Sequence, residues 1–131
     1  MKSRQAGFTM IELIVVIVIL GILAATALPK FIDMRSDAQL ASVQGVAGAA
    51  ASAMNLNYSG CAIKNNVVTA NKCVQISACT QVSSLMQGGV PSGYTVAASG
   101  AAIGTTNGNT ADCTVTAGGQ TATFLGLSAG N

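Results

Sequence analysis

The chain has 131 residues, of which 8% are charged and 4% are aromatic, and its formal net charge is +2. This length allows one small domain beside a single apolar segment and excludes a second core. Of the six cations, all but Lys2 and Arg4 are balanced by the four acids, so no basic patch indicates a dedicated nucleic-acid site. A near-neutral surface favours packing of the chain against copies of itself.

An apolar run covers residues 8–28 and follows a short basic leader, residues 1–7. A helix of this length, rising about 1.5 Å per residue, can span a bilayer. Lys2 and Arg4 predict a cytoplasmic N-terminus and export of the remainder. Glu12 lies inside the run, where a carboxylate costs about 2.5–3.5 kcal/mol at the membrane centre, so we expect it to have a functional partner.

Two ordinary interpretations of the apolar run stay open. Ala25, Thr26 and Ala27 have the small-x-small form of a signal-peptide cleavage site, which would release a secreted binding protein after Ala27. An uncleaved single-pass anchor also fits the length. Neither interpretation gives Glu12 a role, and the helical pattern resumes after Pro29.

The helical pattern continues to about Tyr58. Gly21 and Pro29 lie inside it and weaken it, since Pro removes a hydrogen bond and clashes with the preceding turn. In the second half, apolar residues recur at spacings of three and four and predict a seat for a sheet: Leu40, Val43, Ala47, Ala50 and Met54. Small residues on the same segment would allow close backbone approach: Gly45, Gly48, Ala49, Ala51, Ser52 and Ala53.

Beyond Tyr58 the composition shifts to Gly, Asn, Ser and Thr. We expect a short helix over residues 81–87, strands over 93–98, 112–117 and 120–125, and turns over 99–110. A two-residue turn at Gly118-Gly119 would pair the last two strands. The predicted fold class is α+β, a long N-terminal helix packed against a small antiparallel sheet.

That turn fixes a register. It places Val115 opposite Ala122 and Cys113 opposite Phe124, so that both apolar pairs share one face. The other face receives cross-strand threonine pairs, Thr114 with Thr123 and Thr116 with Thr121.

All four cysteines lie beyond the apolar run: Cys61, Cys73, Cys79 and Cys113. In a small exported domain they predict two disulfides, with three connectivities open. We favour Cys61 with Cys73 and Cys79 with Cys113, because this pairing closes two consecutive loops without crossing. The chain has no His and no close CxxC pair, so no metal site is expected.

The sequence gives little support to catalysis. Without His there is no Ser-His or Cys-His pair, the carboxylates are scattered, and no glycine pattern fits a phosphate loop. A thiol redox protein would need an exposed cysteine of low pKa. We therefore expect a protein that is not an enzyme and needs no cofactor.

The stretch Gly7-Phe8-Thr9-Met10-Ile11-Glu12-Leu13, preceded by the basic leader and followed by Gly21 and Pro29, resembles the signature of type IV prepilins. The resemblance implies that a membrane peptidase cuts after Gly7 and methylates the new N-terminus, Phe8. It also implies that Glu12 pairs with the N-terminal amine of a neighbouring subunit. The helix would loosen between Gly21 and Pro29 when the subunit moves from bilayer to filament.

This resemblance implies a structural subunit of a type IV pilus, serving adhesion, motility or DNA uptake. Residues 1–7 would be the leader, 8–29 the transmembrane and polymerisation helix, and 30–131 the periplasmic and then extracellular headgroup. The subunit would lie in the inner membrane before assembly and in the surface pilus afterwards. Its partners would be copies of itself, the prepilin peptidase, the inner-membrane assembly platform and membrane lipid.

A pseudopilin of a type II secretion system is the main alternative, because the motif is common to both families. The major pseudopilins carry an acidic calcium-binding loop near the C-terminus, where this chain offers only Asp112, and generally lack such disulfides. Both departures favour a pilin. Pro29-Lys30-Phe31, followed by an alanine-rich helix, is similar to pilins of the mannose-sensitive haemagglutinin type.

Overall fold

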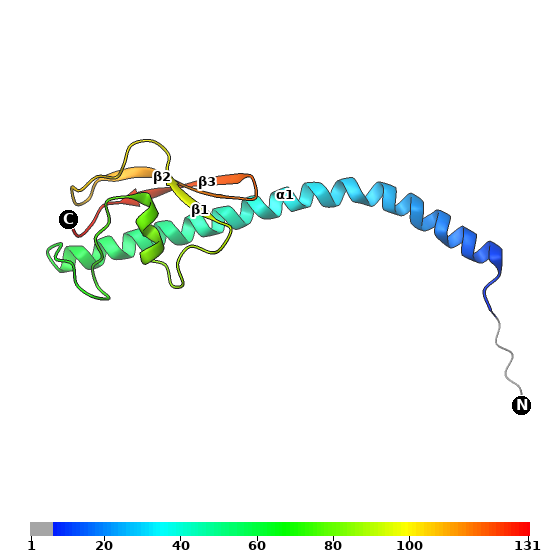
Figure 1. Cartoon of the computed structure of the whole chain (residues 1–131), viewed down its shortest axis with the longest axis horizontal. Helices are drawn as coiled ribbons and strands as arrows, with labels where there is room; N and C mark the ends of the chain where they lie inside the picture. The colour runs from blue at the N-terminus through cyan, green and yellow to red at the C-terminus, as the bar shows by residue number, and fades with distance from the viewer. Residues whose placement is uncertain (1–6) are drawn as a thin grey trace, which may run out of the picture. The chain divides into compact units, whose positions relative to one another are not determined.

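The structure is a computed structural model that describes residues 7–131, except for the side chain of Ile32. The predictions that concern Lys2, Arg4 and the rest of residues 1–6 lie outside the described residues. In chain order the elements are the helix α1 (Met10–Ile63), the 3-10 helix η1 (Cys79–Ser84) and the strands β1 (Thr95–Ala98), β2 (Thr110–Ala117) and β3 (Gln120–Leu127) (Figure 1). Contacts divide the chain into an N-terminal unit ending at Ser36 and a C-terminal unit, Asp37–Asn131.

The helix α1 ends at Ile63, five residues beyond the predicted end at Tyr58. Asn57, Ser59 and Gly60 suggest a turn in the sequence, but tertiary contacts keep this segment helical. The side chain of Asn57 is buried and bonds to the backbone of Val74, and Cys61 is fully buried. Packing has overridden a weak local preference here.

The three strands form one antiparallel sheet in the order β1-β2-β3, which lies over α1 within the C-terminal unit (Figure 1). The predicted register is confirmed, with Val115 opposite Ala122 and Cys113 opposite Phe124. The threonine pairs Thr114–Thr123 and Thr116–Thr121 are confirmed on the other face.

The turn between β2 and β3 supplies the reason for this register. Gly118 and Gly119 have φ of 57° and 78°, as a two-residue turn with both central residues at positive φ requires. The ladder extends beyond the predicted ends to the pair Thr110–Leu127. The first strand starts at Thr95, two residues later than predicted, and Gly93 before it has a φ of 86°.

The core of the C-terminal unit lies between α1 and the sheet. Four of the five predicted seat residues are buried, whereas Leu40 is only partly covered. They pack with Cys113, Val115 and Phe124 from the inner face of the sheet. Three further core residues come from segments outside α1 and the sheet: Ile76, Val82 and Ile103.

The short helix was predicted over residues 81–87 and is instead the 3-10 helix η1, Cys79–Ser84. The side chain of Gln81 explains the earlier start, because its Oε1 accepts hydrogen bonds from the backbone N–H of Ser77 at 2.7 Å and of Ala78 at 2.9 Å. Val82 is fully buried, which anchors η1 to the core.

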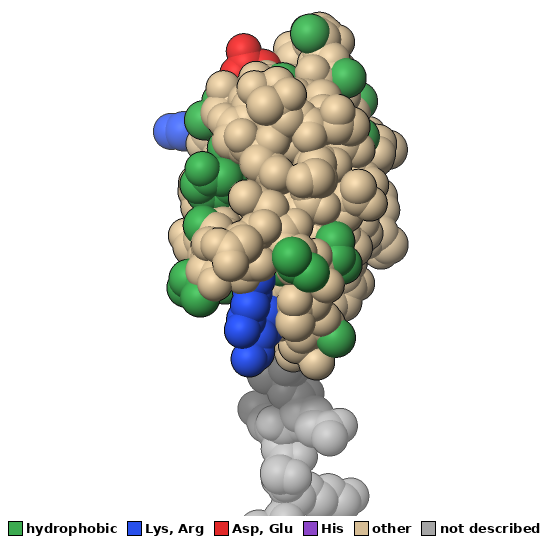
Figure 2. Space-filling view, turned by 90° about the vertical axis from the view of Figure 1, so that its left-hand side faces the viewer, with side chains coloured by type: hydrophobic (Ala, Val, Ile, Leu, Met, Phe, Trp, Pro, Cys, Tyr) green, Lys and Arg blue, Asp and Glu red, His purple; other side chains and the backbone are tan. Residues whose placement is uncertain are grey.

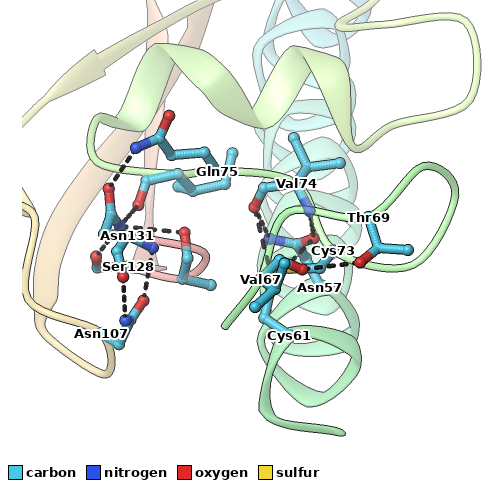
Figure 3. Close-up of a disulfide and its surroundings, with 12 residues drawn as sticks. Asn57, Cys61, Val67, Thr69, Cys73, Val74, Gln75, Asn107, Ser128 and Asn131 are labelled. Atoms are coloured by element: carbon cyan, nitrogen blue, oxygen red, sulfur yellow. Dashed lines mark hydrogen bonds between the residues drawn. A yellow bond between two sulfur atoms is a disulfide. The ribbon is translucent and has the colours of Figure 1, made fainter. Parts of the chain in front are cut away.

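Two disulfides fasten the segments around the core, and they have the connectivity favoured above. Cys61–Cys73 joins the end of α1 to the following loop, and Cys79–Cys113 joins η1 to β2. Beside the first disulfide, Asn57 bonds to both backbone groups of Val74, at 2.8 and 2.9 Å (Figure 3). These links hold the loop-rich connection against α1.

A second polar cluster surrounds the side chain of Asn131 (Figure 3). Its Nδ2 donates to the carbonyl of Ile76 at 2.8 Å and to the hydroxyl of Ser128 at 2.9 Å. Asn107 bonds to the backbone of Asn131 from the other side, at 2.6 and 3.0 Å. Segments far apart in the sequence are thereby held together.

Candidate assembly site

The predicted processing point lies just before α1. Gly7, Phe8 and Thr9 have no regular secondary structure, and the helix begins at Met10. Phe8 is 91% exposed. A Cβ placed on Gly7 would meet nothing within 4 Å, so packing within residues 7–131 does not require glycine there.

Glu12 has a local partner in Thr9. The backbone N–H of Thr9 donates to Oε2 of Glu12 at 2.8 Å, and the Thr9 hydroxyl accepts from the backbone N–H of Glu12 at 3.4 Å. This reciprocal arrangement is a capping box, which satisfies donors at the start of a helix. Glu12 also places a negative charge at the positive end of the helix dipole.

Glu12 was predicted as a site residue, whereas Thr9 was not. The sequence does carry a pattern that indicates Thr9, because a Ser or Thr followed three residues later by Glu and then by an apolar run is typical of a capping box. The structure brings Phe8, Thr9 and Glu12 together within one turn of the chain. It places Gly21 and Pro29 further along the same helix.

The N-terminal half of α1 exposes its apolar side chains on all sides. Its most apolar 18-residue window has a mean hydropathy of 2.8, and none of its residues is buried. Among residues 7–131 this is the one helix long and apolar enough to cross a membrane, judged by length and composition. A helix that is apolar all round needs lipid or other helices around it.

Three features weaken the N-terminal half of α1 while leaving it continuous. Gly21 has no side chain to support the helix, and Pro29 cannot donate to the carbonyl of Ala25. The third feature, Thr26, was not predicted, and its hydroxyl donates back to the carbonyls of Ile22 and Leu23 at 3.3 and 3.0 Å. Such back-bonding slightly destabilises and often bends helices.

Metal binding or thiol chemistry within residues 7–131 would need a group of metal ligands or a free cysteine. There is no group of three or more His, Cys, Asp or Glu side chains able to hold a metal ion. All four cysteines are in disulfides, so they offer no thiol for redox chemistry. The face in Figure 2 shows a few charged side chains and small, separate groups of hydrophobic ones, without an extended field of one sign.

Comparison with known proteins agrees with this geometry. A family model described as "Prokaryotic N-terminal methylation motif" matches residues 2–28. The chain is 36% identical over 122 residues to the type IV narrow pilus major component PilA5 of Thermus thermophilus, a match that covers 92% of this chain and 95% of that protein.

Other similar proteins match a smaller share of the chain. The chain is 44% identical over 59 residues to fimbrial protein EcpC of Eikenella corrodens, covering 45% of this chain and 39% of that protein. It is 49% identical over 53 residues to the type IV major alpha-pilin of Moraxella bovis, covering 40% and 33%. No solved structure matches the chain significantly. The PilA5 match runs nearly end to end, and the chain therefore belongs to the type IV pilin family.

Proposed function

We propose that this chain is a structural subunit that polymerises through the N-terminal half of α1 into a type IV pilus. The observation that carries the proposal is the uncovered apolar helix, none of whose most apolar window is buried. Lipid satisfies that surface before assembly, and the helices of other subunits satisfy it in a filament. The match to a major pilus component supports this function and gives no support to catalysis.

Processing precedes assembly in this proposal. The prepilin peptidase removes residues 1–7 by cutting after Gly7, and it methylates the amine of Phe8. The match to the methylation motif supports this step. The exposed, non-helical Gly7-Phe8 segment would be accessible to a protease.

Glu12 then acts in two ways. One carboxylate oxygen, Oε2, remains bonded to Thr9 and caps the helix. An ionised carboxylate has about four lone-pair sites, so the other oxygen is free to accept from the amine of Phe8 in a neighbouring subunit. The cost of the charge in apolar surroundings is offset twice, by the cap and by the amine.

In this proposal the two parts of the chain, residues 8–29 and 30–131, have different locations before assembly. Residues 8–29 lie in the inner membrane before assembly, with residues 30–131 on the periplasmic side, and both become part of the extracellular pilus. The assembly platform in the inner membrane lifts the subunit out of the lipid. Gly21, Thr26 and Pro29 allow the helix to loosen locally during this transfer.

The first test is the N-terminal sequence and intact mass of pilin from sheared surface material. A start at N-methylated Phe8 supports the proposal, whereas a start after Ala27 in the medium refutes it. Glu12→Gln then separates the two roles of Glu12, because Gln keeps the capping box but carries no charge. We expect Glu12→Gln to abolish pili while full-length pilin stays in the membrane.

Thr9→Ala is the matched variant. It removes the capping hydroxyl and leaves the charge of Glu12, so it should cost about 1 kcal/mol of helix stability and still allow pili. If Glu12→Gln assembles normally, or if Thr9→Ala is the more damaging change, the charge of Glu12 has no role in assembly.

A further inference from the structure

We propose that a groove in the C-terminal unit binds residues 31–37 of a second copy of this chain, with Lys72 of the groove paired to Asp37 of that copy. This inference rests on the filament proposed above and identifies a contact between its headgroups. The groove has a volume of about 400 Å³ and lies between α1 and residues 71–85. Leu56, Leu85 and Lys72 are among its lining residues.

The groove has a mixed lining, in which apolar side chains such as Leu56 and Leu85 stand beside polar ones and a single cation, Lys72. Leu56 projects from α1 and is 76% exposed, although the C-terminal unit has a well-packed core of its own. Lys72 has no ion-pair partner among residues 7–131. A site of this kind suits an apolar side chain accompanied by a carboxylate.

The surface beside the groove is suited to another helix. One face of α1 carries three exposed small residues, Gly45, Gly48 and Ser52. The same face continues to Leu56, which lines the groove. A Cβ at Gly45 or Gly48 would meet nothing within 4 Å, so the packing of this chain explains neither glycine. Each costs about 1 kcal/mol of helix propensity, and a neighbouring backbone that approaches closely would account for that cost.

Residues 31–37 carry the complementary chemistry. Phe31 and Met34 are 67% and 61% exposed, and with Asp37 they recur every third residue along α1. Residues three apart lie on neighbouring parts of a helix surface. The carboxylate of Asp37 is exposed and also lacks an ion-pair partner in the described chain.

The occupant must come from another molecule. Asp37 and Ser52 belong to the same continuous helix, about 22 Å apart along its axis at 1.5 Å per residue. A chain therefore cannot place its own residue 37 in its own groove. A contact in which one patch binds a different patch on the next copy repeats along a helical filament, as a pilus requires.

Cysteine cross-linking tests the contact. The native cysteines are all paired, so Met34→Cys and Leu56→Cys in one chain introduce the two thiols that matter. We expect mild oxidation of sheared filaments to give a ladder of covalent multimers, since every subunit contributes both residues. Met34→Cys with Thr123→Cys, a position on the outer face of the sheet, should give no ladder. Filaments without a ladder in the first variant, or with equal ladders in both, overturn the inference and leave the filament function standing.

Charge exchange tests it without cysteines. We expect Lys72→Glu to reduce the amount of sheared pilin about tenfold, which corresponds to about 1.4 kcal/mol. The double variant Lys72→Glu with Asp37→Lys should restore it, because the pair is re-formed with reversed charges. No loss in the single variant, or no recovery in the double variant, overturns the inference. Absence of pili from the unmodified chain would instead refute the proposed function.

Discussion

Replacement of Gly45 and Gly48 by Ala should make the C-terminal unit more stable and the filament less stable. Both glycines are exposed positions within α1, and a Cβ on either meets no atom within 4 Å. Ala is favoured over Gly in a helix by about 0.8–1.0 kcal/mol per residue, so the double variant gains about 1.5–2 kcal/mol. Part of that gain comes from a less flexible unfolded chain.

Thermal unfolding of the full-length protein in detergent provides the measurement. Tyr58 and Tyr94, the two tyrosines of the chain, both lie in the C-terminal unit, so near-UV circular dichroism reports on that unit. For a domain of 60–100 residues, 1 kcal/mol raises Tm by about 4–8 °C, which gives an increase of roughly 6–16 °C. In filaments the two added methyl groups should obstruct the neighbouring helix and lower the yield of sheared pilin.

Gly60→Ala is the matched control, because the substitution and the helix are the same. A Cβ on Gly60 would overlap the backbone carbonyl oxygen of Lys72, so this variant should lower Tm. A fall in Tm for Gly45→Ala and Gly48→Ala would show that the face is packed within the chain. A rise in Tm with unchanged filament yield would show that no helix approaches it closely.

Two further predictions concern the core and its links. Removing Cys79–Cys113 by paired Ser substitutions should lower the free energy of unfolding by about 4 kcal/mol, and removing Cys61–Cys73 should lower it by about 3 kcal/mol. The larger effect is expected for Cys79–Cys113 because its two cysteines are 34 residues apart in sequence, against 12 for the other pair. Urea unfolding measures both, and the reverse ranking would contradict the loop-entropy argument. Gly126→Ala should cost about 1–3 kcal/mol, because its Cβ would lie 2.5 Å from Sγ of Cys113 and 2.7 Å from Cδ1 of Ile103. Gly100→Ala, whose Cβ meets nothing within 4 Å, is the control and should be nearly neutral in the same unfolding experiment.

The parts of the fold with a strict sequence period were predictable. The spacing of five apolar residues indicated the buried stripe of α1, and four of them are buried, with Leu40 only partly covered. Alternation around Gly118-Gly119 fixed the register of β2 and β3, because a slip of one residue would turn every apolar side chain to the wrong face.

The remaining core could not be read from the sequence. Ile76, Val82 and Ile103 lie outside α1 and the sheet, in short segments where the few apolar residues do not form a period long enough to distinguish core from surface. Asn57 is typical of a turn by residue type, yet its side chain faces inward and replaces backbone partners for Val74. Such roles depend on where a distant segment lies after folding.

The candidate site divides in the same way. Glu12 was conspicuous because a carboxylate is costly in an apolar run, and its local partner Thr9 follows from a three-residue pattern. The proposed second partner, the amine of Phe8, belongs to another molecule and exists only after cleavage. Neither the sequence nor the fold of one chain contains that contact.

The two disulfides bear on how the subunit would survive the proposed transfer out of the membrane. Together they contribute about 7 kcal/mol by the loop-entropy estimate, which is comparable with the whole stability of a typical domain, about 5–15 kcal/mol. Both lie in the C-terminal unit, where they fasten the end of α1 and the strand β2 to the intervening loops. The apolar half of α1 contributes no buried residue to that core, so in the proposed function it would exchange lipid for other subunits without cost to the headgroup. In the proposed function, stability therefore resides in the C-terminal unit and polymerisation in the N-terminal one, and Pro29 and Gly21 would weaken the helix on the assembly side without loosening the core.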